Sequence, residues 1–192
     1  MPPIRLLVAE RDITRMRVDA IVNSADPARV GRNGLNGQIH RIAGPRLLRA
    51  SQSLRGRPAG SVRLTCGYGL PARYILHAIA PNANAAGPTD EEQRLLAQCY
   101  HRCLILASQR RFRTLVFPVL GSGPRGFPFR LAATIALTEI QRYVEHDATL
   151  ERVIVTIYDS RGYDLSNLAK ELLGYYMDEG WVLIDKWDSP LH

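Results

Sequence analysis

Two short segments that consist almost entirely of apolar residues constrain the fold of this chain most. They are Thr114–Leu120 (TLVFPVL) and Arg152–Tyr158 (RVIVTIY). Such runs are typical of strands in a parallel sheet whose two faces are both covered by helices. We therefore expect an α/β fold in which these two strands are buried.

The remaining segments alternate between strand and helix patterns, which predicts one sheet with helices on both sides. Thr89–Arg110 has the strongest helix pattern, because Thr89 and Glu92 have capping-box spacing and apolar residues recur at three- and four-residue steps. Asn36–Gln52 is a second helix, which Pro45 should kink or interrupt. The other predicted strands are Arg5–Ala9, Asp19–Ala25, Val62–Cys66 and Tyr74–Ile79, and the other predicted helices are Arg130–Val144 and Leu165–Met177.

The length of 192 residues fits one domain with a short extension. No internal repeat or low-complexity linker divides the chain. We assign residues 1–179 to the domain and residues 180–192 to a C-terminal extension. Within that extension, Trp181–Trp187 forms either an edge strand or a docked tail.

The net charge of +7 is distributed unevenly. Residues 1–73 hold 13 Arg and 4 acidic residues, whereas residues 147–192 hold 4 basic and 9 acidic residues. A basic front of this kind makes a polyanion such as a nucleic acid a candidate partner. A coding bias is the simpler account of 23 Arg against 2 Lys, and no aromatic–basic RNA motif is present.

Three cysteines without regular spacing, and an N-terminus without a secretion signal, predict a reducing, cytoplasmic location. Cys99 and Cys103 would share a helix face, and we interpret them as core residues because no further residue completes a metal-ligand set. We expect no cofactor and no metal. The longest uncharged stretch, Tyr74–Thr89, is too short and too broken to cross a bilayer, so no membrane partner is expected.

Two glycine-rich loops are candidate ligand sites. Residues 23–40 and 121–128 each follow a predicted strand and lead into a predicted helix. Ligands of open α/β sheets bind beyond the carboxyl ends of the strands, and loops at helix N-termini can direct backbone N–H groups at phosphate. Neither loop matches a Walker A or a G-x-G-x-x-G pattern. Two such loops would suit a diphosphate, although ordinary turns also use glycine.

The chain resembles the macro domain family, which binds ADP-ribose. The family's V-D-A-I-V-N-A-A-N resembles Val18–Asp26 (VDAIVNSAD), and its L-x-G-G-G-G-V-D-G-A-I-H resembles Arg29–His40 without a gap. The family's G-D-I segment resembles Arg11–Ile13, its L-P-A-x-Y-V-I-H motif resembles Leu70–His77, and its P-A-L-G-T-G-x-x-G-F-P motif resembles Pro118–Pro128. These matches keep their order over residues 5–175.

This resemblance implies a three-layer α/β/α fold with a central mixed sheet and a cleft for ADP-ribose. Asp12 would accept a hydrogen bond from the adenine amino group, and Tyr158 either packs near the adenine or is a buried strand-end tyrosine. Asn23 and the segment from Asp26 to Asn36 would surround the distal ribose, with His40 supporting them. The implied ligand-binding residues are Asp12, Ile13, Asn23, Gly31, Arg32, Asn33, Gly34, Gly121, Ser122, Gly123, Pro124, Arg125, Gly126, Phe127 and Tyr158.

The chain departs from the family at positions that the resemblance links to catalysis. In hydrolytic members the second Asn of N-A-A-N orients the ribose and the Asp of V-D-G helps to activate a water; here these positions are Asp26 and Asn36. A carboxamide cannot act as a general base. Asp26 either takes over that role or only binds ribose hydroxyls, so the candidate catalytic residues are Asp26, Asn36 and Asn23.

The loops depart from the family too. Arg32 and Asn33 replace glycines, and Arg125 stands where hydrolytic members often carry an aromatic residue. Arg32 adds a contact to a phosphate, or Arg32 and Asn33 block the distal ribose. The two arginines recognise the diphosphate or a longer polyanion, or they face solvent.

Three functions fit the sequence. The chain is a hydrolase of mono-ADP-ribose or O-acyl-ADP-ribose, a reader that binds ADP-ribose or an ADP-ribosylated macromolecule without turnover, or a nucleotide- or RNA-binding macro fold with a repurposed cleft. The sequence leaves turnover, the modified target and the oligomeric state open.

Overall fold

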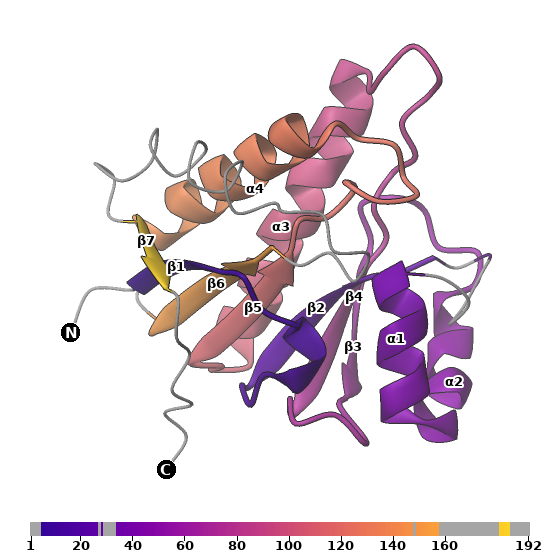
Figure 1. The fold of residues 1–192 in the computed structure, drawn as a ribbon, viewed down its shortest axis with the longest axis vertical. Helices are drawn as coiled ribbons and strands as arrows, with labels where there is room; N and C mark the ends of the chain where they lie inside the picture. The colour runs from indigo at the N-terminus through magenta and orange to yellow at the C-terminus, as the bar shows by residue number, and fades with distance from the viewer. Residues whose placement is uncertain (1–4, 27, 29–33, 148, 158–180, 185–192) are drawn as a thin grey trace.

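The chain folds around a seven-stranded sheet (Figure 1). The computed structural model describes residues 5–26, 28, 34–147, 149–157 and 181–184. Along the sheet the strand order is β3-β4-β2-β5-β6-β1-β7, and β3 is antiparallel to β4 whereas the other neighbours are parallel. The strands are β1 (Arg5–Ala9), β2 (Ala20–Ser24), β3 (Val62–Cys66), β4 (Tyr74–Ala78), β5 (Thr114–Pro118), β6 (Arg152–Thr156) and β7 (Trp181–Ile184). The predicted mixed sheet is therefore confirmed.

Helices cover both faces of this sheet, which gives the three layers expected from the resemblance. On one face α3 (Asp90–Gln109) and α4 (Phe129–Val144) pack in a core with Leu76, Leu115 and Val153. On the other face α1 (Gly34–Ala43) and α2 (Pro45–Ala50) pack in a second core with Ile21, Ile75 and Val116. Both cores share the central strands, so β5 and β6 are buried, as their apolar sequences predict, and β2 and β4 are buried as well.

Local sequence signals explain where the helices begin and end. Thr89 caps α3 in a reciprocal capping box: its hydroxyl accepts from the Glu92 N–H at 3.2 Å, and the Glu92 carboxylate accepts from the Thr89 N–H at 2.6 Å. The helix predicted over residues 36–52 is broken between α1 and α2. Gly44 has a φ of 82° there, and Pro45 opens α2 at a position that needs no N–H donor.

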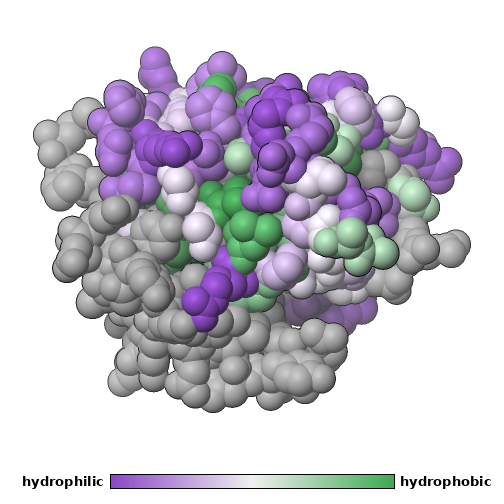
Figure 2. All heavy atoms as spheres, turned by 90° about the horizontal axis from the view of Figure 1, so that it is seen from above, coloured by the Kyte–Doolittle hydropathy of each residue, from purple (hydrophilic) through white to green (hydrophobic). Residues whose placement is uncertain are grey.

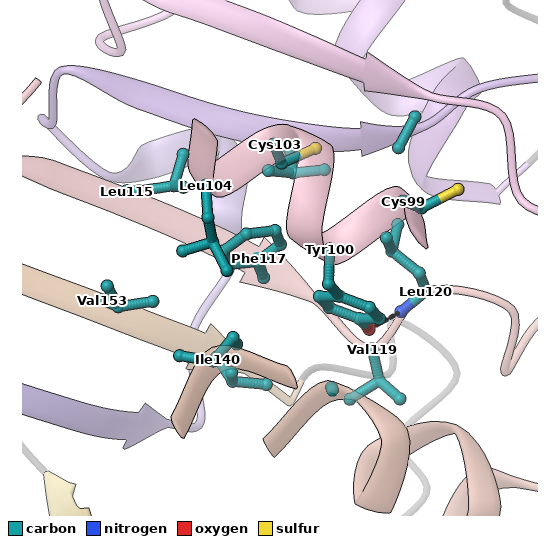
Figure 3. Close-up of a cluster of buried hydrophobic side chains, with 14 of the residues drawn as sticks. Cys99, Tyr100, Cys103, Leu104, Leu115, Phe117, Val119, Leu120, Ile140 and Val153 are labelled. Atoms are coloured by element: carbon teal, nitrogen blue, oxygen red, sulfur yellow. Dashed lines mark hydrogen bonds between the residues drawn. The ribbon is translucent and has the colours of Figure 1, made fainter. Parts of the chain in front are cut away.

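Tyr100 is a core residue of α3 that was not singled out from the sequence. Leu95 and Leu106 of the same helix are only half-buried, whereas Tyr100 is completely buried. Its hydroxyl accepts from the Leu120 N–H at 2.8 Å and lies 3.4 Å from the Pro118 carbonyl (Figure 3). Tyr100 therefore holds the end of β5 and the start of the glycine loop that follows it.

β7 adds an edge strand parallel to β1, which is one of the two forms predicted for this segment. Trp181 is buried there. The predicted helix Leu165–Met177 and the rest of the segment to Trp187 lie outside the described residues, and the boundary at residue 180 stays a prediction. None of the helices that the structure describes is both long enough and apolar enough to span a membrane.

Candidate functional site

The candidate residues gather at the carboxyl ends of the parallel strands. Asn23 lies in β2 and is the register partner of His77 in β4. Asp26 follows β2, and the loop from Gly121 to Phe127 follows β5, which is hydrogen-bonded to β2. Because β4, β2 and β5 are neighbours, the loops that leave them meet at one edge of the sheet.

Asn23 lies buried at the centre of the site formed by the carboxyl ends of these strands. It has no exposed surface, and its Nδ2 donates to Asn36 Oδ1 at 2.9 Å and lies 3.1 Å from His77 Nδ1. The side chains of Asn23 and Asn36 are therefore in direct contact. The Oδ1 atom of Asn23 is also buried, and no group in the described part of the chain donates a hydrogen bond to it.

Two histidines hold these asparagines from behind. His77 Nδ1 faces a donor, so its Nε2 carries the proton and donates to Thr65 Oγ1 at 2.8 Å. Burial, with a smaller contribution from His40, lowers the pKa of His77 from 6.5 to about 3, so the ring stays neutral. His40 Nδ1 donates to the Asn36 carbonyl at 2.8 Å, because a carbonyl only accepts. His77 is therefore a hydrogen-bonded core histidine.

Arg125 joins the loops that follow β2, β4 and β5. Its Nη1 donates to Asn82 Oδ1 at 2.7 Å and its Nη2 donates to the Ala25 carbonyl at 2.9 Å. The same Nη2 lies 3.7 Å from the carboxylate of Asp26. We call this arrangement the Arg125 clasp. Only 14% of the Arg125 side chain is exposed, because three polar groups of the protein hold it at the carboxyl ends of the strands. Of the alternatives left open for Arg125, the one in which it simply faces solvent is therefore excluded.

Asp26 is engaged by two groups. Its Oδ1 accepts from the Ala28 N–H at 3.0 Å, and the Arg125 guanidinium lies beside it. Both contacts are made by the Oδ1 atom of the carboxylate. A third of the Asp26 side chain remains exposed, at 33%.

The loop after β5 presents unpaired backbone donors. Within the described part of the chain, the N–H groups of Ser122, Gly123 and Arg125 donate to no acceptor. Gly121 and Gly126 have φ angles of 85° and 80°, a region that favours glycine. The loop leads into the N-terminus of α4, where Pro128 provides no side-chain cap. Successive free N–H groups at a helix N-terminus form an anion-binding arrangement.

Asp12 lies at the end of the segment after β1 and caps the short 3-10 turn Ile13–Arg15. Its carboxylate accepts from the Thr14 N–H at 2.9 Å, from the Thr14 hydroxyl at 2.6 Å and from Gln38 Nε2 at 3.0 Å. Arg15 Nε also lies 3.6 Å from Asp12 Oδ2, an ion-pair distance that is too long for a hydrogen bond. An ionised carboxylate has about four acceptor positions, so one remains for an amino group of a ligand.

The buried cysteines do not belong to this edge. Cys99 and Cys103 lie in the core beneath α3, as predicted, and burial raises the pKa of the Cys99 thiol to about 12 and that of Cys103 well above its usual range. No group of three or more metal-ligating side chains occurs among the described residues.

Comparison with known proteins agrees with this arrangement. Residues 22–136 match the family described as Macro domain. This chain belongs to the macro domain family. A macro domain-containing protein of Methanosarcina mazei is 40% identical over 155 residues, which cover 81% of this chain and 82% of that protein.

Two further relatives carry more specific names. The Xenopus laevis ADP-ribose glycohydrolase MACROD2 is 38% identical over 148 residues, which cover 77% of this macro domain but only 35% of that protein. A solved structure of a mutant Oceanobacillus iheyensis macrodomain with ADPR has a TM-score of 0.80 and 33% identity, and the match covers 90% of this chain and 94% of that one.

Some predicted site residues of this macro domain lie outside the described residues, namely Gly31, Arg32, Asn33 and Tyr158. Three contributors were missed by the sequence reasoning: Asn82, which accepts from Arg125, Gln38, which donates to Asp12, and Thr65, which accepts from His77. Asn82 lies five residues after the L-P-A-x-Y-V-I-H motif, and this position was the only sequence feature that could have indicated its role. Gln38 and Thr65 become recognisable only when their partners are brought together by the fold.

Proposed function

We propose that this macro domain binds the ADP-ribose group, either free or attached to a macromolecule, and acts mainly as a reader. The free N–H groups of Ser122, Gly123 and Arg125 carry the proposal, because they form a site for a diphosphate at the N-terminus of α4. The ADPR in the Oceanobacillus iheyensis structure supports the choice of ligand.

With the diphosphate on this loop, we assign the other residues to the adenine and to the distal ribose of the ligand. Asp12 retains one acceptor position for the adenine amino group, with Ile13 beside it. Asn23, Asp26, Asn36 and Gly34 lie where the distal ribose would be bound, and Pro124, Gly126 and Phe127 shape the loop around the diphosphate. His40 is a positioning residue, because it holds the backbone carbonyl of Asn36 rather than facing the ligand.

The reader assignment rests on Asp26 and Asn36, which stand where hydrolytic members of the family carry Asn and Asp, respectively. Asn36 offers no proton acceptor of useful basicity, and the Asp26 carboxylate is held by Arg125 and by the Ala28 N–H. Neither residue is therefore well placed to activate a water.

Gly123→Val tests the site without disturbing the fold. A Cβ atom at Gly123 meets no atom within 4 Å and the residue has no positive φ, so the free energy of unfolding should stay unchanged. If the diphosphate lies on this loop, the valine side chain should weaken ADP-ribose binding in calorimetry by at least about tenfold, or about 1.4 kcal/mol. The matched control is Ala85→Val in an exposed loop; equal affinities for the two variants would exclude this loop as the binding site.

Hydrolysis of mono-ADP-ribose or O-acyl-ADP-ribose is the second candidate. It is favoured by the partial exposure of Asp26 and by the similarity to an ADP-ribose glycohydrolase. The assay is release of ADP-ribose from a mono-ADP-ribosylated protein by the wild type and by Asp26→Asn. Turnover that the substitution abolishes would favour the hydrolase, and the absence of turnover in both would favour the reader.

We also propose a reducing, cytoplasmic location. All three cysteines are free thiols in the structure, and two of them are buried in the core, where oxidants reach them poorly.

A further inference from the structure

One side of this macro domain is built from a stretch of sequence without acidic residues. Between Asp26 and Asp90 the chain contains nine Arg and neither Asp nor Glu, although the whole chain has 18 acidic residues. The stretch includes α1, α2, β3 and β4. It therefore forms one end of the sheet together with the two helices that cover that end (Figure 1).

The arginines of this stretch are exposed on the same side. Arg41 lies at the end of α1, Arg49 in α2, Arg55 after the following 3-10 turn and Arg63 in β3, and all four are exposed. We call these four residues the basic face. Their elements are neighbours, because α2 packs against both α1 and β3.

Strand alternation places Arg63 with the others. Thr65, two residues later in β3, contacts His77, whose ring lies 6.4 Å from that of His40 in α1. Side chains at alternate positions of a strand share one face. Arg63 therefore lies on the face of the sheet that α1 and α2 cover.

No carboxylate in the described part of the chain neutralises the charges of the basic face. None of its four guanidinium groups forms an ion pair with a described carboxylate. By contrast, Arg94 in α3 lies 2.6 Å from Glu91 and Arg142 in α4 lies 3.2 Å from Glu139. Clustered, unpaired cations produce a positive potential that attracts a polyanion.

The aromatic residues near the basic face are already occupied. Tyr68 is half-buried beneath the guanidinium of Arg46, which lies 5.3 Å from the ring, and Tyr74 stacks on Phe112 at 4.9 Å. Single-stranded nucleic acids are usually bound by stacking of their bases on free aromatic rings. A duplex instead presents its phosphates, which the planar guanidinium group of arginine binds in a bidentate manner.

We propose that the basic face binds the phosphate backbone of double-stranded nucleic acid without reading its sequence. The face is separate from the proposed ADP-ribose site, since Arg41 lies near the opposite end of α1 from Asn36, and the other three arginines are absent from the loops described above. This macro domain can therefore hold a duplex and an ADP-ribose group at the same time. The proposal does not depend on the ADP-ribose assignment.

Fluorescence anisotropy with short labelled RNA and DNA duplexes of the same sequence tests the proposal. If all four arginines contact phosphates, the logarithm of the association constant should fall against the logarithm of salt with a slope of about −3.6. The affinity should then fall about 100-fold between about 50 mM and about 200 mM salt. The variant carrying Arg41→Gln, Arg49→Gln, Arg55→Gln and Arg63→Gln should bind far more weakly, with a slope close to zero.

The matched control carries Arg94→Gln and Arg142→Gln on the other side and should keep most of the affinity and slope. Thermal unfolding checks that both variants fold, and calorimetry with ADP-ribose should give the same result for both variants as for the wild type. Equal losses in the two variants would overturn the proposal, as would no duplex binding at low salt. Displacement of the duplex by polyglutamate at equal charge concentration would also overturn it, because the face would then accept any polyanion.

Discussion

The carboxylate of Asp26 and the guanidinium of Arg125 lie 3.7 Å apart. Asp26 departs from the second Asn of the family's N-A-A-N motif, and Arg125 departs from the aromatic residue that hydrolytic members often carry at its position. The two departures are therefore linked in space. An Asp at residue 26 supplies an anion, and an Arg at residue 125 supplies the cation that neutralises it while it also binds Ala25 and Asn82. The Arg125 clasp therefore holds together the three loops that follow β2, β4 and β5.

Removal of the Arg125 clasp should weaken ligand binding selectively. In Arg125→Met the loops after β2, β4 and β5 lose their shared partner, so we expect about tenfold weaker ADP-ribose binding, or about 1.4 kcal/mol. ADP, which lacks the distal ribose, should be affected less.

Asp26→Asn keeps an acceptor for the Ala28 N–H and loses only a partly exposed ion pair, so its effect should stay below about 1 kcal/mol. Calorimetry with Arg94→Met as control checks this, and equal affinities for Arg125→Met and Arg94→Met would show that the clasp does not position the ligand.

A carboxylate at residue 36 should create or increase hydrolytic turnover. Asn23 Nδ2 already donates to the side-chain oxygen of Asn36, so Asn36→Asp would receive the same hydrogen bond and place a general base at this position. A positioned base contributes about 100-fold or more to a rate. Release of ADP-ribose from a mono-ADP-ribosylated protein measures the effect, with Asn36→Ala as control. A wild-type rate as high as that of Asn36→Asp would contradict the reader assignment.

The hydroxyl of Tyr100 should contribute measurably to stability. In Tyr100→Phe the buried Leu120 N–H loses its acceptor, which should lower the free energy of unfolding by about 1–3 kcal/mol. Denaturant unfolding gives this value. Tyr74→Phe removes a hydroxyl that has no hydrogen-bond partner among the described residues and should change stability by less than about 0.5 kcal/mol. Similar values for the two variants would mean that the Tyr100 hydrogen bond does not secure the loop.

His77 should make the fold sensitive to acid. Its pKa is lowered to about 3 in the folded chain by burial, whereas the unfolded chain has the ordinary value of 6.5. Below about pH 6.5 the unfolded state binds a proton that the folded state does not, so the contribution of His77 to stability falls by about 1.4 kcal/mol per pH unit as the pH decreases, until about pH 3.

The measurement compares the pH dependence of unfolding in the wild type and in His77→Gln between pH 7 and pH 4. The variant should lose stability less steeply, while His146→Gln, at an exposed histidine, should follow the wild type. Parallel curves for the wild type and His77→Gln would refute the role assigned to the buried ring.

The sheet and its helices could be predicted because they depend on local patterns. The apolar runs of β5 and β6 and the Thr89–Glu92 capping box are contained in a few consecutive residues, and they correctly gave two buried strands and α3. Tyr100 lies four residues after Leu96 and three before Cys103, so the helical period does place it on the buried face of α3. What no local pattern reveals is that its hydroxyl accepts from the Leu120 N–H.

The site could be predicted only in part, for a similar reason. Motif resemblance located Asn23, Asn36 and the loop after β5, and the structure brings the two asparagines into contact. The environment of Arg125 could not be predicted, because its three partners come from segments after two other strands. Such contacts depend on which strands become neighbours in the sheet.

The most direct test of the proposed function is titration calorimetry of the full chain with ADP-ribose, ADP and AMP. The account predicts micromolar binding of ADP-ribose, about −8 kcal/mol, with weaker binding of ADP and weaker binding still of AMP, because each truncation removes contacts with Asn23 or with the loop from Gly121 to Phe127. Equal affinities for the three ligands, or no binding of ADP-ribose at millimolar concentration, would contradict it.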